Sequence, residues 1–270
     1  RRLIFTIPEL TKPNILIIVG SIIFVFFTLF IGTSKIQFSQ EIVFVGSFGI
    51  ILFLLIKLSN ELDQKPKKML VGTAIIIFVF RAMPGVGQGG SWFEIDVLNF
   101  DQEFLSLLGL IASFLTIFGI FVLRPLMEKS SMSKLIIILS IAGSFFILPS
   151  IAMYYGFHEY TSKLTGGIVD ERFIAIFNTA LESPLGQISM IPILAWIAQS
   201  APNHLKATFF AILASFTNLA LSASNLGTKY LNQIFVITRE VKTNEGDIKI
   251  PSDYSELGIL LIIVCLLTLT

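Results

Sequence analysis

Long, continuous apolar runs are the feature that most constrains how this chain can fold. A helix needs ~20 mostly apolar residues to cross ~30 Å of hydrocarbon. Several runs approach or exceed that length, and charged residues or Gly and Pro clusters bound them. A membrane β-barrel would instead show alternating polarity over ~10 residues. The predicted fold is all-α, a polytopic membrane bundle of about eight transmembrane helices. The predicted spans are residues 13–33, 41–58, 69–84, 102–127, 133–157, 169–199, 206–235 and 255–270.

The composition agrees with a lipid environment and excludes several functions. Hydrophobic residues make up 54% of the chain, charged residues 14%, and the mean hydropathy is +0.83. A soluble domain of 270 residues could not bury that much apolar surface, so membrane lipids are expected partners. The net charge of +1, with basic residues scattered between apolar runs, gives no reason to expect nucleic acid. Cys265, His158 and His204 are too few for a disulfide framework or a metal cluster, so no metal or cofactor is expected.

The distribution of Lys and Arg orients the spans. Basic residues outnumber acidic residues in cytoplasmic loops, and alternate loops of this chain differ clearly in that respect. The amino-terminal end is therefore predicted to lie inside. The basic side collects Arg1, Arg2, Lys12, Lys57, Lys65, Lys67, Lys68, Arg124, Lys129, Lys134 and Lys206, against Glu9, Glu61, Asp63 and Glu128. The charged stretch 57–68, which contains Pro66, predicts a boundary between two bundles, residues 1–64 and 65–270.

Glu182 is the main ionisable residue predicted at membrane depth. It lies about 18 Å along the sixth span, close to mid-bilayer, where a carboxylate is costly. Asn178 lies one helical turn before it on the same face. Pro184 and Pro192 interrupt this span and permit a bend. A functional site is the sharper interpretation, and one helix-to-helix hydrogen bond made by a protonated Glu182 is the alternative.

A polar stripe follows the seventh span. Its members recur at intervals of three, four or seven residues and therefore share one side of a helix. They are Thr208, Ser215, Asn218, Ser222, Asn225 and Lys229. Such a stripe either holds neighbouring helices together or lines a cavity, and both interpretations stay open. The second, fifth and eighth spans carry almost no strongly polar group, so they are predicted to face lipid.

Arg81 closes the third span. A guanidinium cannot lose its proton, so it requires water, headgroups or an acidic partner. It is either an interfacial anchor or a contact for an anionic or carboxylate group of a solute. The glycines that follow at positions 85, 87, 89 and 90 do not follow a strand, so they predict no nucleotide-binding loop.

Three stretches carry a resemblance to a known family. The pattern of spans resembles the major facilitator superfamily, in which two six-helix bundles meet at a cytoplasmic loop. More specifically, the chain is similar to the folate-biopterin transporter family. The similar stretches are Phe80-Arg81-Ala82-Met83-Pro84, residues 99–104 from Asn99 to Phe104, and the two parts Gly186 to Pro192 and Ala207 to Asn218. The Gly- and Arg-rich loop of the superfamily persists only as Gly119, Arg124 and Lys134.

The resemblance implies a secondary active transporter that moves small organic solutes by alternating access, among them pterin or folate-like compounds. It also implies that these spans are helices five to twelve, in a multi-pass protein of the plasma membrane or bacterial inner membrane. The chain begins without methionine and ends inside an apolar run, so we expect a piece of a longer protein. The implied substrate-binding or coupling residues are Arg81, Asn178, Glu182, Gln187, Asn218 and Asn225, with a proton as the coupling ion.

Two other classes of function are alternatives to transport. A membrane enzyme acting on lipid-linked substrates would be expected to cluster acids, histidines or cysteines, whereas the acids here are dispersed and the two histidines lie apart. We therefore expect no enzymatic activity. A membrane sensor or scaffold that transports nothing is the remaining alternative, and the sequence does not exclude it.

Overall fold

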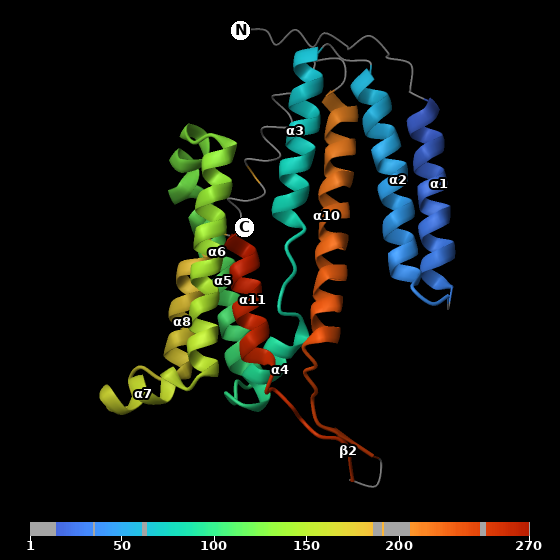
Figure 1. Cartoon of the computed structure of the whole chain (residues 1–270). Helices are drawn as coiled ribbons and strands as arrows, with labels where there is room; N and C mark the ends of the chain where they lie inside the picture. The colour runs from blue at the N-terminus through green and yellow to red at the C-terminus, as the bar shows by residue number, and fades with distance from the viewer. Residues whose placement is uncertain are drawn as a thin grey trace. The chain divides into compact units, whose positions relative to one another are not determined.

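The computed structural model describes residues 15–34, 36–60, 64–185, 191, 206–243 and 247–269. The described chain is mainly helical, with one small two-stranded sheet (Figure 1). The helices are α1 (Ile15–Thr33), α2 (Ser39–Asn60), α3 (Gln64–Arg81), α4 (Gln88–Asp96), α5 (Gln102–Lys129), α6 (Met132–Tyr154), α7 (Phe157–Leu164), α8 (Glu171–Glu182), the 3₁₀ turn η1 (Ser183–Leu185), α10 (Lys206–Ile234) and α11 (Leu257–Leu269), and the strands are β1 (Val241–Lys242) and β2 (Ile248–Ile250).

The predicted all-α membrane bundle is confirmed as a fold class. Within the described ranges, four helical stretches are long and apolar enough to cross a bilayer, and three shorter helical stretches are also apolar. The four are Ser39–Lys57, Gln102–Lys129, Lys134–Tyr154 and Phe210–Ile234, and the shorter three are Ile18–Thr33, Leu70–Arg81 and Leu257–Leu269. The total of about eight spans stays a prediction, and so does the division at residue 64.

Two local features of the helices follow from proline. Pro66 lies in the first turn of α3, which begins at Gln64, five residues before the predicted start of the third span. A first turn tolerates proline because its N–H groups have no helical partner there. Pro184 lies in η1, directly after α8 ends at Glu182. The predicted interruption at Pro184 is therefore confirmed, whereas Pro192 lies outside the described residues.

The chain separates into two compact units. Unit 1 comprises Arg1–Val79 and Ile197–Ser222, and unit 2 comprises Phe80–Trp196 and Ala223–Thr270. In unit 1, α1 packs on α2. The rings of Phe48, Phe78 and Phe216 join α2, α3 and α10, with centroids 5.5 to 6.3 Å apart. Such aromatic contacts add to the burial that holds the helices together.

Unit 2 has its own apolar core. The core residues come from α4, α5, α6, α8, α11 and the turn between α4 and α5. They are Phe93, Leu98, Phe100, Phe104, Met153, Ala175, Leu257 and Leu261. Asp101 caps α5 by accepting a hydrogen bond from the backbone N–H of Phe104 (2.7 Å). The cap therefore places Phe104 in the core at the start of the helix.

Helices α6 and α11 form the most extensive helix pair of unit 2. Ser144 Oγ donates to the carbonyl of Cys265 (3.0 Å), and Cys265 Sγ donates to the carbonyl of Ser144 (3.4 Å). Leu257, Gly258, Leu260, Leu261, Val264 and Cys265 of α11 are buried. One face of α11 therefore packs within unit 2, whereas Ile259, Ile262, Leu266 and Leu269 are exposed. The prediction that the eighth span faces lipid stays a prediction, because apolar side chains pack against a neighbouring helix as readily as against lipid.

Candidate functional site

The segment of residues 82–87, which joins α3 to α4, rests on one face of α10. This segment has no regular secondary structure, so its backbone groups need partners outside it. Three residues of α10, spaced four apart, supply those partners. Ser224 Oγ donates to the carbonyl of Met83 (2.6 Å), the N–H of Gly85 donates to Thr228 Oγ1 (2.8 Å), and Asn232 Nδ2 donates to the carbonyl of Val86 (3.1 Å).

Arg81 is the last residue of α3 and directly precedes this segment. Its side chain is partly buried, and its Nε atom is buried with no hydrogen-bond partner among the described residues. A cation suits the carboxyl end of a helix, where the backbone carbonyls concentrate negative charge. An unpaired guanidinium N–H in a buried position is costly, so Arg81 has unused capacity to bind an anion.

Two polar faces of α10 have different roles. Ser224, Thr228 and Asn232 hold the 82–87 segment, and the sequence interpretation did not single them out. Of the predicted stripe, Asn218 and Asn225 are exposed, and their amides make no hydrogen bond to the part of the chain that the structure describes. Both amides are therefore available to a solute or to water. The hydroxyls of Ser215 and Ser222, also exposed, donate to the carbonyls of Ala211 and Asn218 in their own helix.

Helix α8 carries the predicted residues Asn178 and Glu182. Asn178 Nδ2 donates to the carbonyl of Phe146 on α6 (3.3 Å), so it joins two helices. Glu182 is the last residue of α8 and its side chain is exposed. Thr116 Oγ1 of α5 donates to the carbonyl of Ser183 (3.0 Å), which fixes the turn that follows Glu182.

The predicted site residues are brought together only in part. Asn178 and Glu182 lie one turn apart on α8, and Asn225 lies next to Ser224, which contacts the segment that follows Arg81. Arg81 and Glu182 form no ion pair in the described chain. Gln187 lies outside the described residues.

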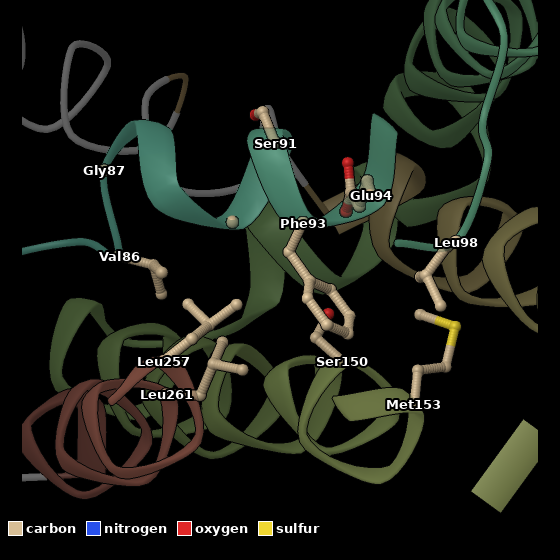
Figure 2. Close-up of a pocket in the computed structure, with 11 residues that line it drawn as sticks. Val86, Gly87, Ser91, Phe93, Glu94, Leu98, Ser150, Met153, Leu257 and Leu261 are labelled. Carbon is tan, nitrogen blue, oxygen red and sulfur yellow. The ribbon is translucent and has the colours of Figure 1, made fainter. Parts of the chain in front are cut away.

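A cavity of about 200 Å³ lies between α4, α6 and α11. Figure 2 shows Phe93 reaching from α4 toward Ser150, between Leu257 and Met153. The lining is mainly apolar, and Ser91, Glu94 and Ser150 contribute the polar side chains. Burial raises the pKa of Glu94, because the charged carboxylate loses contact with water. The cavity is one further place where a small ligand could fit.

Ion pairs outside the spans connect distant segments, and the sequence interpretation missed them. Arg239 donates two hydrogen bonds to Asp96 (2.9 and 2.7 Å), and Tyr254 Oη donates to Asp96 Oδ2 (2.6 Å). The bonds from Arg239 and Tyr254 lower the pKa of Asp96. Burial, reinforced by the bond to Asp96, raises the pKa of Tyr254 to about 12.

A second ion pair joins the starts of α5 and α8. Arg172 donates to Asp101 Oδ2 (2.8 Å), and its guanidinium lies 5.0 Å from the centroid of the Phe104 ring. The N–H of Phe104, with help from Arg172, lowers the pKa of Asp101. Asp101 belongs to one of the stretches that carry the family resemblance, and its visible role is to cap α5 and pair with α8.

No metal centre is visible in the described ranges, where no three His, Cys, Asp or Glu side chains gather. The chemistry that the described residues offer is hydrogen bonding and charge pairing. Arg81, Asn218, Asn225 and Glu182 provide a cation, two amides and a carboxylate without fixed partners in the described chain. Each of these groups can form hydrogen bonds with a polar partner.

Comparisons with known proteins identify the family. A curated folate-biopterin transporter from Synechocystis sp. is 21% identical over 154 residues, which are 57% of this chain and 30% of that protein. No solved structure matches the chain. The model of the BT1 family matches residues 11–270. Because that match covers nearly the whole chain, this protein belongs to the BT1 family.

Proposed function

We propose that this protein is a secondary active transporter that moves small organic solutes by alternating access, with pterin or folate-like compounds as its substrates. The observation that carries the proposal is the family match over residues 11–270. The apolar helices support a membrane location, and the name of the Synechocystis relative supports the substrate class. We place the protein in the plasma membrane or bacterial inner membrane, with about eight spans in the arrangement of the major facilitator superfamily.

Arg81 is the residue that we assign to a substrate carboxylate. Its guanidinium is always charged and presents several donors in a fixed plane, which matches a carboxylate. The partly buried position and the unpaired Nε support this assignment. Substrate binding would supply the acceptor that the described chain does not.

The amide side chains are assigned to the polar edges of the substrate. Asn218 and Asn225 support this role best, because both are exposed on α10 and seven residues apart, and so on one face. Asn178 bonds a carbonyl of α6, so its contribution would follow release of that bond. We include Gln187 on the strength of the family resemblance alone.

Glu182 is the residue that we assign to proton coupling. A carboxylate near mid-bilayer can take up a proton on one side and release it on the other when its surroundings change. Its place at the end of α8, next to the turn at Pro184, supports the idea that its surroundings change when that helix moves.

Uptake into proteoliposomes tests the proposed function. The full-length protein would be assayed with and without an imposed pH gradient, against pterins, folates, peptides and nucleosides. Uptake of pterins or folates above that of empty vesicles, increased by the gradient, is the expected result. Uptake of peptides or nucleosides alone would overturn the substrate class, and no uptake of any solute would favour a sensor or scaffold.

A further inference from the structure

We infer that Ser224, Thr228 and Asn232 of α10 are positioning residues for Arg81, and that together they form a latch on the 82–87 segment. The inference rests on the proposed role of Arg81 in binding a substrate carboxylate. None of the three residues needs to touch the substrate. They would act by fixing the backbone that follows Arg81, and so the direction of its guanidinium.

The latch satisfies backbone hydrogen-bonding groups of the 82–87 segment. A hydroxyl has one donor and can also accept. Thr228 Oγ1 accepts from the N–H of Gly85 (2.8 Å) and donates to the carbonyl of Ser224 (2.9 Å), so both functions are used. Asn232 Nδ2 donates to the carbonyls of Val86 (3.1 Å) and Thr228 (2.8 Å). The latch is therefore a connected set of bonds along one face of α10.

Two glycines allow the segment and the helix to approach closely. A Cβ atom on Gly227 would lie 3.1 Å from Pro84 Cβ. Gly87 has a φ of 77°, which favours glycine, and a Cβ atom there would lie 2.9 Å from Asn232 Nδ2. A Cβ atom at position 87 would displace the Asn232 amide, and one at position 227 would require Pro84 to shift by a few tenths of an ångström. Gly87 belongs to the glycine-rich stretch that follows Arg81. That stretch is not a nucleotide-binding loop, and Gly87 has a local structural role in it.

Arg81 is close enough along the chain for the latch to fix its backbone position. Only Ala82 separates it from Met83, whose carbonyl accepts from Ser224 Oγ (2.6 Å). Both the end of α3 from Phe80 and the latch face of α10 belong to unit 2. Because Arg81 Nε has no hydrogen bond in the described chain, the position of its guanidinium depends on its backbone and packing. A fixed backbone gives the pre-organisation that a binding group needs.

Thr228→Val is the sharpest test, because it keeps the shape of the side chain and removes the acceptor for Gly85. In the full-length protein we expect the KM for folate, which carries carboxylates, to rise about tenfold. The KM for biopterin, which carries none, should stay within about twofold. Thr228→Ser, which keeps the hydroxyl, should restore the folate KM. Thr217→Val is the matched control, since among the described residues Thr217 Oγ1 bonds only the carbonyl of Leu213 in its own helix (2.9 Å).

A double-mutant cycle distinguishes positioning from general damage. Arg81→Gln should raise the folate KM, and Thr228→Val should add nothing in that background, because both changes remove the same interaction. Independent, additive effects of the two changes would overturn the latch as a positioning device. Equal losses for folate and biopterin in Thr228→Val would overturn it as well.

A readout that does not depend on transport separates the latch from the proposed function. Modification of Arg81 by phenylglyoxal, followed by peptide mass spectrometry, should be severalfold faster in Thr228→Val than in the wild type and the Thr217→Val control. Should the wild type transport neither folate nor biopterin, the proposed function fails, and this rate still decides on the latch. An unchanged rate would show that the latch does not hold Arg81.

Discussion

Asp96 joins distant segments of unit 2 through its carboxylate. It accepts two bonds from Arg239 and one from Tyr254, and its side chain is 26% exposed. We expect Asp96→Asn to lower the free energy of unfolding by about 1 kcal/mol, as is typical of a well-formed ion pair near the surface. A thermal unfolding assay in detergent at pH 7 measures the change as a lower Tm.

The pH dependence of that change has a definite sign. The pKa of Asp96 is lower in the folded protein than in the unfolded chain. Its stabilising contribution is therefore present above about pH 4 and is lost as the pH falls through the folded pKa. The Tm difference between wild type and Asp96→Asn should shrink over that range. Glu240→Gln removes an exposed ion pair with Lys242. This variant should have the same Tm as the wild type at pH 7 and below about pH 4.

Glu182 is the residue on which the coupling hypothesis depends. Glu182→Gln keeps the shape and the hydrogen-bonding groups but removes the titration, so it should abolish proton-driven accumulation in proteoliposomes. Folding should be unaffected, with a Tm close to that of the wild type, and exchange of substrate should persist. Glu171→Gln, in the first turn of the same helix, is the control and should accumulate normally. Normal accumulation and pH dependence in Glu182→Gln would disprove the coupling role.

The sequence predicts single residues of the candidate site better than it predicts their partners. Arg81 and Glu182 stand out because a charge within or beside an apolar run is costly, and that cost depends on the sequence alone. The Asp96–Arg239 pair could not be predicted, because 143 positions separate its members and exposed charges are common in loops. Thr228 and Asn232 were missed for a related reason, since their partners are backbone atoms of a distant segment.

Helix α5 and the turn η1 meet at Gly119. A Cβ atom on Gly119 would lie 2.5 Å from Pro184 Cα and 2.6 Å from Pro184 O, both backbone atoms that cannot move aside cheaply. Gly119→Ala should therefore lower the free energy of unfolding by roughly 1–3 kcal/mol. The Tm of the purified protein measures this loss.

Gly109→Ala is the matched control on the same helix. No described atom would lie within 4 Å of a Cβ atom on Gly109, apart from its chain neighbours and the backbone of its own helix. Alanine also favours a helix over glycine by about 0.5–1 kcal/mol. Gly109→Ala should thus leave the Tm equal or slightly higher. Equal destabilisation by both changes would show that the contact with Pro184 is not the cause.

Long apolar helices can be predicted from the sequence more accurately than short helices. Long apolar helices such as α5 and α6 begin and end within a few residues of the predicted spans, because apolar length is what the sequence records directly. The short helices α4 and α7 lie between the predicted spans, apart from Phe157 at the end of the fifth, and were not predicted as helices. Helix α4 contains Gly89 and Gly90, and burial of Phe93 in the core of unit 2 overrides their low helix propensity.

The positive-inside rule predicts that the two ends of α5 lie on opposite sides of the membrane. At ~1.5 Å per residue, this 28-residue helix is roughly 42 Å long, enough to cross a bilayer. Its first turn follows Asp101 and contains Glu103, whereas Arg124 and Lys129 lie near its end. Acidic residues at one end and basic residues at the other match an outside start and a cytoplasmic end.

Single-cysteine labelling tests this orientation. Cys265→Ser removes the native thiol while keeping a donor for the carbonyl of Ser144. In that background, cysteines at Lys65 and Lys129 should resist a membrane-impermeant maleimide applied to intact cells, and a cysteine at Asp247 should react. Permeabilised cells provide the control, because all three positions should react there. Asp247 is exposed between β1 and β2, so a lack of reaction would reflect its location rather than burial. Labelling of Lys65 and Lys129 from the outside, with Asp247 protected, would reverse the orientation and place the segment that follows Arg81 on the cytoplasmic side.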